Sequence, residues 1–467
     1  MLRKAFQDTF TRWTFLFFAV MTLFAVVFAK ERFQADGAHY LLHVVQSEDF
    51  RIEHQRYILI FSQLLAWIGV KVGISLNGIF ILNSLNPVLW FLGLFVYAVR
   101  FLKDKRAAIG IILTSVLGVL HIQFIPMYEI YYGIPLIILL YSHIINERTS
   151  SLIDILLFVA ILCTALFAHP LLPIPIAFVL LYSSFERRKL DVRLWIVSAL
   201  VIAGWYIAKK VMLTEYEAGK MALVTADWNT AYKQLYHISY YGKLGVFFFT
   251  WYTVPVCVFI CTGLFFVARN MKIQLVLMLA FFFGHILIVN FTHENDPILT
   301  PYFERMYLPL IPIVLIPFLF TLCRELQFSK SFIVLALLLV VGWRMARFSH
   351  IGHMYLARTY QTEHLIAAAS SSEGSKFVMN ESDFRNCYPW ADWSFVMETL
   401  LRSSAINTQR SLSIAIPEDM TEGNNATGLG QDEFLFRRWD VIKDTDLNPK
   451  YFSVRHGQYI VLPAICK

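Results

Sequence analysis

Acidic and basic side chains gather in three short polar stretches of an otherwise apolar chain. The first follows Lys30 and contains Asp36, the second surrounds Glu129, and the third ends near Arg305. A carboxylate at the edge of a membrane is costly to desolvate unless it has a partner or a function. An ionised carboxylate can act as a general base, and a planar guanidinium suits the binding of a phosphate. These three stretches are therefore the candidates for a catalytic site.

Each of these side chains also has a purely structural interpretation. Loops between membrane helices are polar because they meet water, so an Asp or Glu there can simply be solvated. Arg305 is the only Lys or Arg between residues 292 and 306, and it could pair with Glu304 or Asp296 or reach the lipid headgroups. Asp36 and Tyr40 lie four residues apart and would share one face of a helix. This favours a functional site at Asp36 over a carboxylate that is simply solvated in a loop.

The composition places the chain among polytopic membrane proteins. Of its 467 residues, 57% are hydrophobic and 16% are charged, whereas an ordinary soluble domain has about 25% charged residues. Mean hydropathy is +0.57. These values exclude disorder, and the 6 cysteines exclude a disulfide scaffold. In such a protein the net charge of +7 reports membrane orientation, so no nucleic-acid partner is expected.

Apolar runs long enough to cross a bilayer predict an all-α bundle of about eleven transmembrane helices. The runs cover about residues 13–29, 76–99, 108–125, 132–145, 152–167, 171–185, 194–208, 244–267, 273–291, 307–323 and 331–348. Residues 58–70 are also apolar, but the run is short, so it is expected to lie along the outer membrane surface.

The basic residues predict an orientation for this bundle. The expected inner segments hold 16 Lys and Arg in 45 residues, and the expected outer loops hold 11 in 112. Because Lys and Arg mark cytoplasmic loops, the N-terminus is expected in the cytoplasm, with the first run as a retained anchor. The default location is a bacterial cytoplasmic (inner) membrane.

The chain is expected to divide into a transmembrane part, 1–343, with an outer loop at 30–75, and a small extracytoplasmic α/β domain, 344–467. Strands are predicted at 376–380, 411–416 and 459–463, and a helix at 390–404. Cys387 and Cys466 would face an oxidising compartment, where they could form a disulfide or remain buried thiols.

The order of these features resembles the GT-C superfamily of integral-membrane glycosyltransferases, which includes the aminoarabinose transferases and the protein O-mannosyltransferases. The matching stretches are Gln34-Ala-Asp36-Gly-Ala-His39-Tyr40, the apolar helix 57–73, Glu129 in the second outer loop, and Phe303-Glu304-Arg305-Met-Tyr307-Leu-Pro309. Two departures stand out. Gly37 follows Asp36 where many members have a second acidic residue, and Met306 separates Arg305 from Tyr307.

The resemblance implies transfer of a sugar from a polyprenyl-phosphate donor to an acceptor on the extracytoplasmic face. Asp36 would be the base, Glu129 would position the base or the acceptor, and Arg305 would bind the donor phosphate, helped by Arg56 or His54. One base and a single displacement would invert the sugar carbon. The remaining substrate-binding candidates are His39, Tyr40, His293, Glu294, Asp296, Glu304 and Tyr307.

Several alternatives stay open. The acceptor could be a glycolipid, a glycan or a protein, and membrane lipid surrounds the site in each case. A divalent metal held by Asp36, Glu129 and Asp296 is less favoured than a site without a cofactor. A transporter or flippase of lipid-linked glycans is the rival function, although transporters place ionisable groups at mid-membrane and often show internal repeats.

Overall fold

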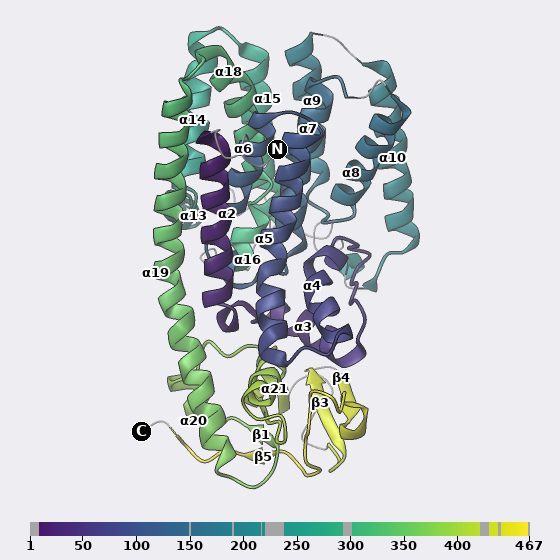
Figure 1. Cartoon of the computed structure of the whole chain (residues 1–467), viewed down its shortest axis with the longest axis vertical. Coiled ribbons are helices and arrows are strands. Elements are labelled where there is room, and N and C mark those ends of the chain that lie inside the picture. The colour runs from purple at the N-terminus through teal and green to yellow at the C-terminus, as the bar shows by residue number, and fades with distance from the viewer. Residues whose placement is uncertain are drawn as a thin grey trace.

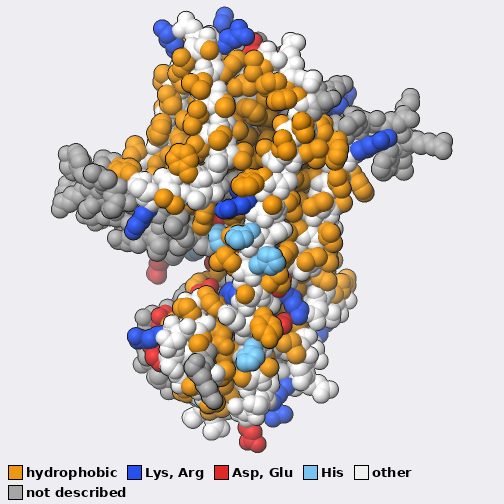
Figure 2. Space-filling view, turned by 90° about the vertical axis from the view of Figure 1, so that its left-hand side faces the viewer, with side chains coloured by type: hydrophobic (Ala, Val, Ile, Leu, Met, Phe, Trp, Pro, Cys, Tyr) orange, Lys and Arg blue, Asp and Glu red, His pale blue; other side chains and the backbone are white. Residues whose placement is uncertain are grey.

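Long apolar helices form a bundle that occupies most of the molecule, and a small α/β domain lies at one end of it (Figure 1). The computed structural model describes residues 9–148, 151–188, 191–215, 217–219, 238–292, 301–420, 429–437 and 440–465. Apolar side chains cover the outside of the bundle in the face shown in Figure 2, as expected of a protein surrounded by lipid.

The bundle and the outer loop contain these helices: α2 (Thr9–Val27), η1 (Lys30–Arg32), α3 (Asp36–Ser47), α4 (Leu59–Lys71), α5 (Leu76–Arg100), α6 (Lys105–Val116), η2 (His121–Phe124), α7 (Glu129–Ile145), α8 (Leu152–Leu166), α9 (Pro173–Arg187), α10 (Val192–Val211), α13 (Ile238–Trp251), α14 (Thr253–Ala268), α15 (Lys272–Thr292), α16 (Pro301–Met306), α17 (Leu310–Ile316), α18 (Cys323–Leu326) and α19 (Lys330–Ser370). A π-helical turn, Pro317–Leu322, joins α17 to α18. The short apolar segment predicted on the outer surface is the helix α4.

The structure does not support eleven transmembrane helices. Within the described residues, four helices are long and apolar enough to cross a membrane: Leu76–Arg100, Val192–Val211, Lys272–Asn290 and Phe332–Ser370. A fifth span arises if the pair Tyr241–Trp251 and Thr253–Ala268, bent by 95°, counts as one. The other predicted runs form shorter or broken helices. The run at 108–125, for example, leaves the helix after Val116.

The turns predicted to face the cytoplasm meet at the end of the bundle opposite the α/β domain (Figure 1). Arg187 binds Glu147 at 2.8 Å, Arg324 binds Glu186 at 2.9 Å, and Asn146 donates to Asp104. Helices begin there with side chains that accept hydrogen bonds from the first turn, namely Asp104, Ser151, Asp191 and Ser329. These contacts tie together the turns at this end of the bundle, and their predicted orientation toward the cytoplasm stays a prediction.

The C-terminal domain contains β1 (Lys376–Val378), α20 (Glu381–Asn386), α21 (Phe395–Ile406), β2 (Ser413–Ala415), β3 (Glu433–Arg437), β4 (Asp440–Lys443) and β5 (Ile460–Val461). The three predicted strands are confirmed, and they form one parallel sheet in the order β2-β1-β5. Phe377 of β1 pairs with Ile414 and Ile460. The antiparallel β3–β4 hairpin was not predicted. Cys387 is disulfide-bonded, and Cys466 lies outside the described residues.

The helix α19 runs without a break from the bundle into the domain, so the expected boundary at 344 falls inside it. Arg358 of α19 makes a bidentate ion pair with Glu398 of α21, both bonds at 2.6 Å, and Arg402 binds the same carboxylate at 2.8 Å. Asn448 also donates to the carbonyl of Val45 in α3. The domain is therefore fixed to the outer loop that carries Asp36.

Candidate active site

Two carboxylate–guanidinium pairs lie next to each other where the bundle meets the outer loop. Arg305 Nη1 donates to Asp36 Oδ2 at 3.1 Å, and Arg56 Nη1 donates to Glu129 Oε1 at 2.8 Å. The charges of Glu129 and Arg56 also act on Asp36, so the four groups belong to one cluster. The structure thus brings together four of the residues predicted to carry the reaction.

A sharp turn presents Asp36 to the site. Ala35 has φ 46° and ψ −125°, a conformation that L-residues rarely adopt, and Asp36 is the first residue of α3. Strained backbone of this kind persists where the surrounding structure enforces it, often at functional sites. The helix N-terminus also favours the ionised carboxylate, because the dipole of α3 places partial positive charge there.

An irregular backbone segment between α6 and α7 presents Glu129. Glu304 accepts hydrogen bonds from the backbone amides of Leu120 and His121, the latter at 2.9 Å. Arg344 of α19 donates to the carbonyls of Val116, at 2.8 Å, and Val119. Buried non-helical backbone needs such partners inside the protein. This segment then leads into α7, whose first residue is Glu129.

The position of Arg305 is set by the residue that precedes it in the chain and by the contacts of its own side chain. It follows Glu304 directly, so the carboxylate that holds the irregular segment also fixes the backbone that carries the guanidinium. The guanidinium carbon lies 4.6 Å from the ring centroid of Tyr128. Arg305 is therefore held between the aromatic face of Tyr128 and the carboxylate of Asp36.

The two carboxylates differ in their access to solvent. The Asp36 side chain is 32% exposed and that of Glu129 is 5% exposed. Burial raises the pKa of the Asp36 carboxyl above its ordinary value, while Arg305 opposes that shift. Asp36 is therefore the more accessible of the two carboxylates.

His39 and Tyr40 line the same region from α3 but make structural contacts. His39 lies 3.1 Å from Glu53 through Nε2, and Arg51 binds the same carboxylate at 3.2 Å. Although burial opposes it, His39 and Arg51 hold the pKa of Glu53 below its ordinary value. Tyr40 packs in a small buried cluster. Both predicted residues therefore lie beside Asp36, where they support the position of α3.

His54 stands at the other edge of the cluster, next to two charged residues that the sequence did not indicate. Its Nδ1 lies 3.0 Å from Thr214 Oγ1, and Lys209 donates to its carbonyl at 2.6 Å. Lys209 also pairs with Glu217 at 3.0 Å. No feature of the sequence indicated this contact, because Lys209 and His54 lie 155 residues apart in the chain.

Other predicted substrate residues have different surroundings. Tyr307 is buried in the bundle, where its hydroxyl donates to Asn290 Oδ1 at 2.7 Å. Glu304 is also buried and bonds backbone, as described above. His293, Glu294 and Asp296 lie outside the described residues. The structure therefore groups Asp36, Glu129, Arg305, Arg56, His54, His39 and Tyr40, and places Tyr307 in the core.

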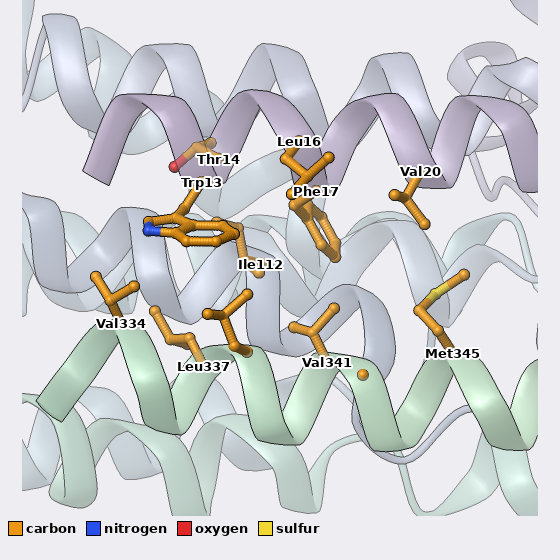
Figure 3. A pocket seen from close by; sticks show the side chains of 12 residues that line it. Trp13, Thr14, Leu16, Phe17, Val20, Ile112, Val334, Leu337, Val341 and Met345 are labelled. Carbon is orange, nitrogen blue, oxygen red and sulfur yellow. The ribbon is translucent and has the colours of Figure 1, made fainter. Parts of the chain in front are cut away.

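The part of the chain that the structure describes contains no group of three or more His, Cys, Asp and Glu side chains able to hold a metal ion. An apolar groove of about 270 Å³ lies away from the charged cluster, between α2 and α19 (Figure 3). It is lined by Trp13, Thr14, Leu16, Phe17, Val20, Ile112, Val334, Leu337, Leu338, Val341, Gly342 and Met345. None of the charged residues described above contributes to it.

Known proteins give no guide to the chemistry of this cluster. No family model, curated protein or solved structure matches the chain. The function must therefore follow from the side chains and their geometry.

Proposed function

We propose that the protein is a membrane glycosyltransferase that moves a sugar from a polyprenyl-phosphate donor to an acceptor hydroxyl. The observation that carries the proposal is the paired arrangement of Asp36 with Arg305 and of Glu129 with Arg56. Transfer from a lipid phosphate needs a base for the attacking hydroxyl and positive charge for the leaving phosphate. The cluster supplies both, beside a bundle that would hold the lipid chain.

In the proposed reaction Asp36 accepts the proton of the acceptor hydroxyl. The hydroxyl oxygen forms a bond to the anomeric carbon while the bond from that carbon to the phosphate oxygen breaks. The phosphate leaves with the electron pair, and Arg305 stabilises its charge by giving up part of its contact with Asp36. A single displacement of this kind inverts the configuration at the sugar carbon.

Glu129 and Arg56 have a supporting part in this scheme. Glu129 is nearly inaccessible to solvent, and its ion pair holds Arg56 within the cluster. Arg56 then adds positive charge for the phosphate without competing for the acceptor proton. The retaining scheme with a carboxylate nucleophile is not required, because one accessible carboxylate is enough for single displacement.

The proposed orientation places the N-terminus in the cytoplasm and the α/β domain outside, in a bacterial inner membrane. Support comes from the basic turns, which gather at the end of the bundle away from the charged cluster. Cytoplasmic loops carry this excess of Lys and Arg. A flippase of lipid-linked glycans is the second candidate, because the apolar groove between α2 and α19 could hold a lipid chain on its way across.

The direct test is turnover of purified protein in nanodiscs with a polyprenyl-phosphate hexose pool. Asp36→Asn and Asp36→Ala should each lower the rate by about 100-fold or more, the contribution of a general base. Asp49→Asn is the matched control, because Asp49 is an exposed carboxylate in the same outer loop. Wild-type rates in both Asp36 variants would exclude Asp36 as the base.

A further inference from the structure

A polar pocket of about 210 Å³ lies where the C-terminal domain meets the bundle. Its walls come from η1, α5, α19 and α21, and its lining residues are Lys30, Asn77, Phe80, Glu363, Arg402, Ala405 and Ile406. Lys30 lies three residues beyond the end of α2, and Asn77 is the second residue of α5, which is long and apolar enough to cross a membrane. The pocket therefore lies at the level where lipid headgroups would surround the bundle.

Arg402 supplies a buried cation to the wall of this pocket, with only 2% of its surface exposed. Its Nε donates to Glu398 at 2.8 Å, and its Nη2 donates to the carbonyl of Lys30 at 2.8 Å. Its Nη1 is buried and has no hydrogen-bond partner among the residues that the structure describes. A buried donor without an acceptor is costly. An oxygen atom of a ligand in the pocket would remove this cost.

The positive charge of Arg402 is only partly compensated by the protein. Its partner Glu398 also makes the bidentate pair with Arg358, so one carboxylate serves two guanidinium groups. Glu31 is a further carboxyl near Arg402, but burial raises its pKa, which disfavours the ionised form. A phosphodiester would add the missing negative charge and would accept a charge-assisted hydrogen bond from Nη1.

An ion pair that a ligand can open lines the more accessible side of the pocket. Lys30 Nζ lies 3.0 Å from Glu363 Oε1, and the two side chains are 49% and 33% exposed. Exposed pairs of this kind contribute little stability, so their separation costs little. An anion alone would leave Glu363 without a partner, and a cation alone would leave Lys30 without one. A zwitterion with a phosphate and an ammonium group would pair with both.

We propose that this pocket binds the phosphoethanolamine headgroup of a membrane phospholipid. The phosphodiester accepts hydrogen bonds from Arg402 and Lys30, and the primary ammonium donates to Glu363. Ile406, which is 59% exposed, adds an apolar side chain next to which the acyl chains can leave the pocket. The lipid would then join the domain to the bundle at the membrane surface. This inference does not depend on the proposed transferase function.

Native mass spectrometry of the purified full-length protein measures this binding directly. Phosphatidylethanolamine should bind about tenfold or more tightly than phosphatidylcholine, whose methylated ammonium has no N–H to donate, and than phosphatidylglycerol, which has no ammonium. Soluble glycerophosphoethanolamine should compete only weakly, because it has no acyl chains. Equal affinities for the three lipids would overturn the inference. Competition by glycerophosphoethanolamine at the same concentration as the lipid would overturn the assignment to a phospholipid.

Substitutions at the ion pair test the two parts of the zwitterion separately. Glu363→Gln should abolish the preference for phosphatidylethanolamine over phosphatidylglycerol, because the partner of the ammonium is removed and the pocket gains net positive charge. Lys30→Gln should weaken the binding of both lipids about tenfold. Glu381→Gln is the control, because Glu381 is an exposed carboxylate paired with Arg385 and does not line the pocket. The unfolding temperature without added lipid verifies that each variant is folded, and an unchanged preference in Glu363→Gln would contradict the proposal.

Discussion

At the scale of single residues, the Asp36–Arg305 pair joins a partly exposed carboxylate to a guanidinium in one small volume. The guanidinium offsets part of the desolvation of the carboxylate. In the proposed reaction a donor phosphate would draw Arg305 away, so Asp36 would lose part of this stabilisation and become a stronger base. The proposal therefore predicts that donor binding and activation of the acceptor are linked.

The pH dependence of kcat/KM should report this coupling. Asp36 must be ionised to act as a base, so the rate should fall as pH drops through its raised pKa, with an acid limb above the ordinary value of 3.8. Arg305→Ala removes a charge that lowers this pKa, so the limb should move to higher pH, and Arg305→Lys should move it less. The measurement is a pH–rate profile of the three proteins.

The control for this profile is Arg51→Ala. Arg51 belongs to the same outer loop but pairs with Glu53, so the acid limb should stay in place. A limb that stays in place, or moves to lower pH, in Arg305→Ala would contradict the assigned pair.

At the scale of elements, Glu304 connects the fold to the site. Burial raises the pKa of its carboxyl to about 8, although the amides of Leu120 and His121 lower it. Between pH 4.5 and about 8 the folded protein therefore binds more protons than the unfolded chain. The free energy of unfolding contributed by Glu304 is thus largest at low pH and falls as pH rises through that window.

Thermal unfolding across pH tests this role of Glu304. The stability of wild type relative to Glu304→Gln should decrease as pH rises from 4.5 to about 8, because the Gln side chain does not titrate. Glu304→Ala should lose about 1–3 kcal/mol, since buried amides lose their acceptor. Glu325→Ala, which removes an exposed carboxylate near Arg324, is the control and should change neither quantity.

The sequence predicted the elements that depend on local pattern and missed those that depend on distant partners. Apolar runs indicated many of the helices, although not eleven spans, and short apolar segments in a polar stretch indicated the three strands of the domain. The break after Val116 was not visible, because the groups that stabilise it, Glu304 and Arg344, lie almost two hundred residues or more away. Asp36, Glu129 and Arg305 stood out in the sequence because they are charged in apolar surroundings, and the structure brings them together. Lys209 had no such local signal.

At the scale of the whole molecule, polarity varies from one end to the other. The turns that carry Arg187 and Arg324 lie at one end of the bundle, and the α/β domain lies at the other (Figure 1). Cysteine labelling of intact cells tests whether the two ends of the molecule lie on opposite sides of the membrane, as proposed. Ser371→Cys, at an exposed position in the domain, should react with an impermeant thiol reagent.

Lys105→Cys is the matched position at the basic end, also exposed, and should react only after the cells are permeabilised. The unsubstituted protein gives the background from its native thiols, among which Cys257 and Cys261 lie exposed on α14. Labelling of Lys105→Cys but not of Ser371→Cys in intact cells would reverse the orientation.

The unbroken α19 has a mechanical consequence. Its 41 residues give a rod of roughly 60 Å, about twice the apolar thickness of a bilayer. Each residue added to such a rod would lift the domain by about 1.5 Å and turn it by about 100°, which would break its contacts with the outer loop, such as that of Asn448 with Val45. Loops elsewhere can change length without this penalty. The rotation of the domain relative to the outer loop is therefore encoded in the residue count of one helix.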